Sequence, residues 1–170
     1  MSGAGKTTIA NALLARLKPD HPQAIIVDGD EVRALFGSDL GYHEADRRVQ
    51  IGRLQRIARW LDDADMVAIV AALYAHPDLL RWNRESFSRY FEVYVEAPLE
   101  LLQGRDSKGL YGGAASGAVE NVVGVDIPWH PPEQPDLVVD AAREEPPATI
   151  VAAIAEQVVP MLRPGTAGAA

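Results

Sequence analysis

A short glycine-rich run followed by Lys and Thr stands at residues 2–8 (SGAGKTT), directly after Met1. Glycines in such a turn let backbone N–H groups face the phosphates of a nucleotide, while the Lys reaches the outer phosphates and the first Thr hydroxyl binds Mg²⁺. A helix predicted over 6–17 would direct its positive end at the same anion. The run therefore predicts a P-loop that binds a nucleoside triphosphate with Mg²⁺, the alternative being a chance turn before a helix. The predicted nucleotide contacts are Gly3, Ala4, Gly5, Lys6, Thr7 and Thr8.

Two carboxylates follow the next apolar run. Ala24–Val27 predicts a buried strand, and Asp28 and Asp30 come directly after it. Ligands bind at the carboxyl ends of strands in α/β sheets, so we expect Asp28 to assist Mg²⁺ and Asp30 to orient or deprotonate an attacking hydroxyl. The alternative is a simple turn in which an Asp caps a helix over 31–36.

Several cations could bind phosphates. Arg33, Arg47 and Arg53, taken singly, are typical of solvated helix charges. Arg105 and Lys108 are better candidates, because they adjoin a glycine-rich, poorly periodic segment at 108–129. Such long irregular segments are typical of lids, and a lid cation would neutralise charge on a transferred phosphoryl group.

The histidines and tryptophans carry weaker signals. The four histidines, His21, His43, His76 and His130, show no metal-ligand spacing, so we expect surface or loop positions. We expect Trp60 on the packed face of a helix, whereas Trp129, within the irregular segment, could cover a nucleobase.

Strands and helices alternate along the chain. Further strands are predicted at 66–73, 91–96 and 137–140, with helices over 44–61, around Trp82 and Phe87, over 99–105 and over 149–162. This alternation predicts an α/β fold with a parallel sheet covered by helices on both faces. We expect one domain over 1–163, with a lid at about 105–130, and a disordered tail at 164–170. The strand that normally leads into a P-loop is missing, as is the motif's first Gly; we expect a start upstream or a fold lacking one central strand.

Composition limits the partners. A net charge of −8 argues against a general nucleic-acid binder. No apolar run is long enough to span a membrane and no signal peptide is seen, so we expect a cytoplasmic protein. The chain has no cysteines, which excludes disulfides and thiolate metal sites.

Taken together, these motifs resemble the adenylyl-sulfate kinases, P-loop enzymes that phosphorylate the 3′-hydroxyl of adenosine 5′-phosphosulfate. The resemblance covers residues 2 to about 140 in one order of motifs: the P-loop, DGDEVR at 28–33, DLGY at 39–42, Asp46-Arg47, RDSKGLY at 105–111, then Asn121, Gly124, Asp126 and the prolines up to 135. It implies ATP and Mg²⁺, a small nucleotide acceptor and a possible homodimer. It also implies that Thr7 and Asp28 hold the metal, that Arg105 binds ATP, and that Arg33 and Arg47 hold the acceptor's 5′-phosphate. The other acceptor contacts it implies are Tyr42, Gln50, Lys108, Glu120, Asn121 and Val122.

The chain departs from the family pattern mainly in the acceptor pocket. Tyr74-Ala75 replaces the family's Ser-Pro, Gln50 its Asn, and 120–124 (ENVVG) its Lys-Asn-Phe-Thr-Gly. A carboxylate at Glu120 would repel a sulfate, and Val122 removes one face of an adenine stack. We expect ATP-dependent phosphorylation of adenylyl sulfate, with another activated nucleotide, such as a cytidine diphosphate derivative of surface-polysaccharide synthesis, as the alternative acceptor. A truncated, noncatalytic nucleotide-binding protein is the third hypothesis.

Overall fold

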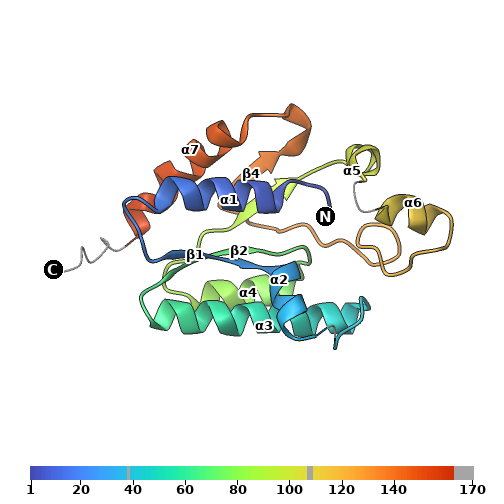
Figure 1. Cartoon of the computed structure of the whole chain (residues 1–170), viewed down its shortest axis with the longest axis horizontal. Helices are drawn as coiled ribbons and strands as arrows, with labels where there is room; N and C mark the ends of the chain where they lie inside the picture. Colours follow the sequence, from blue (N-terminus) through green and yellow to red (C-terminus); the bar gives the residue numbers. More distant parts are fainter. Residues whose placement is uncertain (38, 107–108, 163–170) are drawn as a thin grey trace.

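The computed structural model describes residues 1–37, 39–106 and 109–162, so the predicted tail lies outside the described residues. Its four strands form two parallel pairs (Figure 1). β1 (Ala24–Asp28) pairs with β2 (Val67–Ala71), with Ala24 opposite Val67, and β3 (Val93–Glu96) pairs with β4 (Leu137–Asp140), with Val93 opposite Leu137. The predicted parallel α/β architecture is thereby confirmed, but as two pairs instead of one continuous sheet.

Helices cover both sides of the β1–β2 pair. The α-helices are α1 (Lys6–Leu17), α2 (Gly29–Leu35), α3 (Glu44–Asp63), α4 (Pro77–Ser86), α5 (Leu99–Arg105), α6 (Leu110–Ala115) and α7 (Pro147–Val158), with 3₁₀ turns at Ala141–Arg143 and Val159–Met161. α3 and α4 lie on one side of the β1–β2 pair, and α1 and α7 lie together on the other (Figure 1). Within the described residues, no helix is both long and apolar enough to cross a membrane.

The strands and most helices lie close to their predicted bounds. α6 is a correction, because a short helix forms within the segment expected to be irregular. Asp106 explains it: its Oδ1 accepts from the Leu110 amide at 2.8 Å and its Oδ2 from the Gly112 amide at 2.9 Å. These carboxylate contacts satisfy amides of the first turn, which a glycine-rich sequence alone does not predict.

The prediction for Trp60 was wrong. Leu54 and Ala58 are buried on α3, where Leu54 packs with Val27 and Val32. Trp60 is 71% exposed. Residues two positions apart lie on nearly opposite faces of an α-helix. Trp60 therefore points away from the face that carries Ala58, although its side chain is apolar.

One hydrophobic cluster lies directly beneath the P-loop. Ala4, Leu102, Tyr111 and Val122 are buried together, and Leu102 is 0% exposed. The Tyr111 hydroxyl also donates to the Ser2 carbonyl at 3.2 Å. A second cluster joins α1, α7 and the strands through Leu13, Leu17, Val139 and Ile154 among others. The first cluster therefore ties the P-loop to α5, α6 and the segment that follows α6.

A cavity of about 390 Å³ separates the two strand pairs. β2 contributes residues 67–71 to its wall, β3 contributes 93–95, and α1 contributes Ile9 and Leu13. Its lining is mostly apolar. Among the described residues, neither β2 nor β3 has a strand partner on the edge that borders this cavity.

Candidate active site

The P-loop turn has the backbone that its glycines predict. Gly3 (φ 76°) and Gly5 (φ 95°) both adopt the left-handed conformation that favours glycine. Gly5 is the N-cap of α1, and Ala4 between the two glycines is buried. The Lys6 ammonium donates to the Met1 carbonyl at 2.7 Å. The turn thus places the positive end of a three-turn helix beside a lysine, an arrangement suited to an anion.

Thr7 and Asp28 meet across the site. The Thr7 hydroxyl donates to Asp28 Oδ2 at 3.0 Å, while Asp28 Oδ1 accepts from the Asp30 amide at 2.8 Å and caps α2. The end of β1 and the start of α1 are therefore joined through one carboxylate. A hydroxyl and a carboxylate oxygen side by side fit the hard oxygen ligands that Mg²⁺ prefers, so this pair could hold the ion of a bound MgATP.

Asp30 lies in the first turn of α2, two residues beyond Asp28 and exposed to solvent. Its position at the carboxyl end of β1 is the one expected for a group that meets a ligand. The capping alternative also holds in part, but Asp28, not Asp30, is the cap.

Two guanidinium groups converge on Tyr42. Arg33 donates to the carbonyls of Leu40 and Gly41 at 3.0 and 2.9 Å, and its guanidinium lies 4.7 Å from the centre of the Tyr42 ring. Arg47 lies 5.6 Å from the same ring and donates to the Tyr42 carbonyl at 2.9 Å. We call Arg33, Tyr42 and Arg47 the arginine–tyrosine cluster. Its paired cations suit a phosphate, and its ring suits a nucleobase.

Arg47 is the buried member of this cluster, at 8% exposure. Burial and the neighbouring Arg33 lower the pKa of Arg47 below its ordinary value. It also donates to the Asn121 carbonyl at 2.6 Å, although the two residues are 74 positions apart. The structure thereby brings the predicted acceptor residues of α2, α3 and the 121 segment together.

Gln50 is buried one turn along α3 from Arg47. Its amide nitrogen donates to the Gly29 carbonyl at 3.0 Å, and its amide oxygen has no hydrogen-bond partner among the described residues. A buried amide oxygen without a partner is costly, and a ligand N–H would satisfy it.

The segment around residue 122 is held by Asp126. The Asp126 carboxylate accepts from the Asn121 and Val122 amides. Burial opposes ionisation, but these amide donors and Arg47 lower the pKa of Asp126 overall. The Val122 side chain packs in the cluster beneath the P-loop, while the Glu120 side chain is exposed. Their predicted roles at the acceptor stay predictions.

The predicted lid residues lie farther along the chain. Arg105 is exposed, with its guanidinium 3.4 Å from Glu144 Oε1, and Lys108 lies outside the described residues. Trp129 is half-buried and its indole N–H lies 3.4 Å from the Tyr94 hydroxyl. A role for Trp129 over a nucleobase also stays a prediction.

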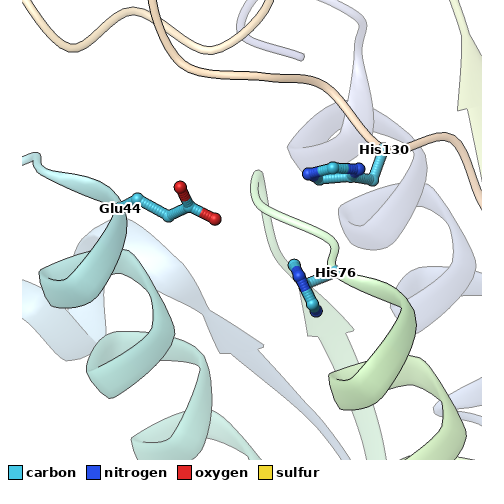
Figure 2. A group of neighbouring side chains, drawn as sticks. All are labelled: Glu44, His76 and His130. Atoms are coloured by element: carbon cyan, nitrogen blue, oxygen red, sulfur yellow. The ribbon is translucent and has the colours of Figure 1, made fainter.

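Sequence reasoning missed one group of side chains. Glu44, His76 and His130 each offer a ligand atom, and these atoms lie within 4.8 Å of one another. Figure 2 shows the three side chains around one common space, from the start of α3, the start of α4 and the segment after residue 128. Spacings of 32 and 54 residues resemble no metal motif, so only the fold brings them together. His21 lies in a loop, as one of the expected positions, but it is buried at 8% exposure.

Comparisons with known proteins agree with this geometry. The family model described as adenylylsulphate kinase matches residues 1–140. An adenylyl-sulfate kinase of Pseudomonas aeruginosa is 37% identical over 148 residues, which cover 86% of this chain and 76% of the relative. A cytidine diphosphoramidate kinase of Campylobacter jejuni is 37% identical over 143 residues, covering 82% and 81%. The structure of the Mycobacterium tuberculosis APS kinase in complex with AMPPNP and APS aligns with a TM-score of 0.82 at 28% identity, over 92% of this chain and 91% of that one.

Proposed function

Because the chain belongs to the adenylylsulphate kinase family, we propose that it transfers the γ-phosphate of ATP to the 3′-hydroxyl of adenylyl sulfate. The observation that carries this proposal is the 3.0 Å hydrogen bond between Thr7 and Asp28. It joins the P-loop to the acids at the end of β1, where phosphate, metal and acceptor must meet.

The chemistry is an in-line displacement. The acceptor oxygen forms a bond to the γ-phosphorus while the bond from that phosphorus to the bridging β–γ oxygen breaks, so that ADP leaves. Lys6 and the amides of residues 3–8 bind the phosphates. Thr7 and Asp28 would hold Mg²⁺, and the ion would neutralise the charge that develops during transfer. Asp30 takes the proton of the attacking hydroxyl.

The acceptor would bind at the arginine–tyrosine cluster. Arg33 and Arg47 hold its 5′-phosphate, and Tyr42 stacks against its base. The Gln50 amide and the Asn121 segment complete the pocket, with Glu120 and Val122 at its border. Arg105 and Lys108 close over the transferred phosphoryl group. We place the reaction in the cytoplasm, and a homodimer remains the expectation that the resemblance implies.

A cytidine diphosphate derivative is the second candidate acceptor. The Campylobacter jejuni relative named cytidine diphosphoramidate kinase is as similar to this chain as the Pseudomonas aeruginosa kinase is, at 37% identity. The exposed carboxylate of Glu120 favours this acceptor, since it would repel a sulfate but can accept a hydrogen bond from an amide-like group.

The test offers ATP, Mg²⁺ and each acceptor in separate reactions and measures kcat/KM from ADP release. We expect turnover with adenylyl sulfate and formation of its 3′-phosphorylated product. Turnover with the cytidine derivative alone would retain the phosphoryl-transfer site and replace the acceptor. Folded, ATP-binding protein that is silent with both would favour the noncatalytic hypothesis.

A further inference from the structure

The ends of three separate segments meet at Glu44, His76 and His130. Glu44 is the first residue of α3, His76 is the N-cap of α4, and His130 follows the irregular segment. All three side chains are half-buried, and they surround one common space (Figure 2). The two imidazole rings pack edge to face, with centroids 5.2 Å apart.

Each donor has a neighbour that can orient it. The Tyr74 hydroxyl donates to Glu44 Oε1 at 2.8 Å, which leaves the second carboxylate oxygen for another partner. Partners of this kind fix the direction of metal-binding carboxylates.

His76 has a comparable neighbour in Asp78. The Asp78 amide donates to His76 Nδ1 at 3.3 Å, and Asp78 Oδ2 lies 3.4 Å from the same nitrogen. Ion binding at Nε2 would place the ring proton on Nδ1, which would then exchange the hydrogen bond from the Asp78 amide for one to the Asp78 carboxylate. That is the usual arrangement behind a metal-bound histidine. Arg48 and Arg81 each lie 3.5 Å from Asp78, so the charges around the cluster, among the described residues, are two carboxylates and two guanidinium groups.

We propose that Glu44, His76 and His130 form a binding site for a first-row divalent ion of the Zn²⁺ type. Two imidazoles and one carboxylate are a common zinc set that leaves a coordination position open, whereas Mg²⁺ prefers oxygen ligands. Zinc bonds of about 2.0–2.2 Å require ligand atoms closer together than 4.8 Å, a change that side-chain rotation can supply. The bound ion would link the starts of α3 and α4 to the segment at 130, one turn from Arg47.

The test titrates the full chain with Co²⁺ and with Zn²⁺, without ATP or acceptor, so its outcome is independent of the proposed kinase reaction. We expect one ion per chain and the visible absorption of four-coordinate Co²⁺. His130→Ala should weaken binding at least about 10-fold, because one of three ligands is lost. His76→Asn should do the same while keeping a residue that can cap α4. His43→Ala, which removes an exposed histidine next to Glu44, is the matched control and should bind as the wild type does.

Equal binding by the wild type, His130→Ala and His43→Ala would overturn the proposal, as would the absence of stoichiometric binding by the folded wild type. Mg²⁺ in excess should leave the Co²⁺ absorption unchanged. Loss of the absorption on adding Mg²⁺ would contradict the assigned ion class.

Discussion

Asp28 uses its two carboxylate oxygens for different partners. Oδ1 accepts from the start of α2 and Oδ2 accepts from the Thr7 hydroxyl. The cap fixes the carboxylate, and the fixed carboxylate holds the threonine that a P-loop uses for its metal. At the proposed Mg²⁺ site, metal affinity would therefore depend on local backbone structure as well as on the ligands themselves.

Removal of the Thr7 hydroxyl should weaken the use of Mg²⁺ more than the fold. In Thr7→Ala, we expect the Mg²⁺ concentration that gives half-maximal ATP turnover to rise about 10–100-fold. Thr149→Ala, which removes an exposed hydroxyl at the start of α7, is the control. A wild-type Mg²⁺ dependence in both variants would contradict the role of the Thr7 hydroxyl in Mg²⁺ binding.

At the scale of elements, α5 packs against the P-loop. Leu102 is fully buried with Ala4, and a Cβ placed on Gly3 would lie 3.7 Å from Leu102 Cδ2. Interiors packed this closely transmit a change of volume to their neighbours. The position of the phosphate-binding turn thus depends on a side chain almost a hundred residues later.

Leu102→Ala should lower both stability and ATP affinity. We expect about 2–5 kcal/mol of lost unfolding free energy, as for other large-to-small core substitutions. Ile154→Ala, in the cluster between α1 and α7, should cost a similar amount. ATP affinity is measured at a temperature where both variants remain folded, and only Leu102→Ala should lose it. An equal effect on ATP affinity would mean that α5 has no specific role in placing the P-loop.

At the scale of the molecule, Arg84 links α4 to the second strand pair. Its guanidinium lies 3.3 Å from Asp136 Oδ2 and 3.6 Å from Glu92 Oε2, and it also donates to the Gln134 carbonyl. Burial raises the pKa of Glu92, while Tyr90 and Arg84 oppose that rise. The buried carboxylate is therefore tolerated through its partners.

Arg84→Met should destabilise the protein in a pH-dependent way. Because the folded-state pKa of Glu92 is already raised, its charged form disfavours folding, and stability falls as pH rises through that pKa. Without Arg84 the rise is larger, so we expect a loss of about 1–3 kcal/mol at neutral pH and a much smaller loss below the ordinary pKa of Glu. Urea unfolding of the wild type and the variant across this pH range measures the difference in unfolding free energy. Arg81→Met, on the same helix with an exposed side chain, should change little.

If Arg84→Met lowers the free energy of unfolding equally at every pH, Arg84 stabilises the fold through packing and not through its charge.

The sequence predicted best where the signal was local. The P-loop, the strand-end acids and most helix bounds depend on residues close together in the chain. The prediction for Trp60 was wrong because it relied on the apolar side chain and not on the position of residue 60 around the helix. The cluster of Glu44, His76 and His130 could not be predicted, since three distant elements assemble it. The burial of Val122 in the cluster beneath the P-loop is likewise set by tertiary packing. The separation of the strands into two pairs, in contrast, agrees with the expectation of a fold lacking one central strand.

The most direct test of the proposed phosphoryl transfer compares the wild type with Asp30→Asn, using ATP, Mg²⁺ and adenylyl sulfate. We expect the wild type to turn over and the variant to lose about 10²–10⁴-fold in kcat, as when a general base is removed. ATP affinity, measured by calorimetry, should stay nearly unchanged, and Asp20→Asn, on the exposed turn after α1, should match the wild type in both. A fully active Asp30→Asn variant, or a folded wild type that binds ATP but phosphorylates no nucleotide, would contradict the account.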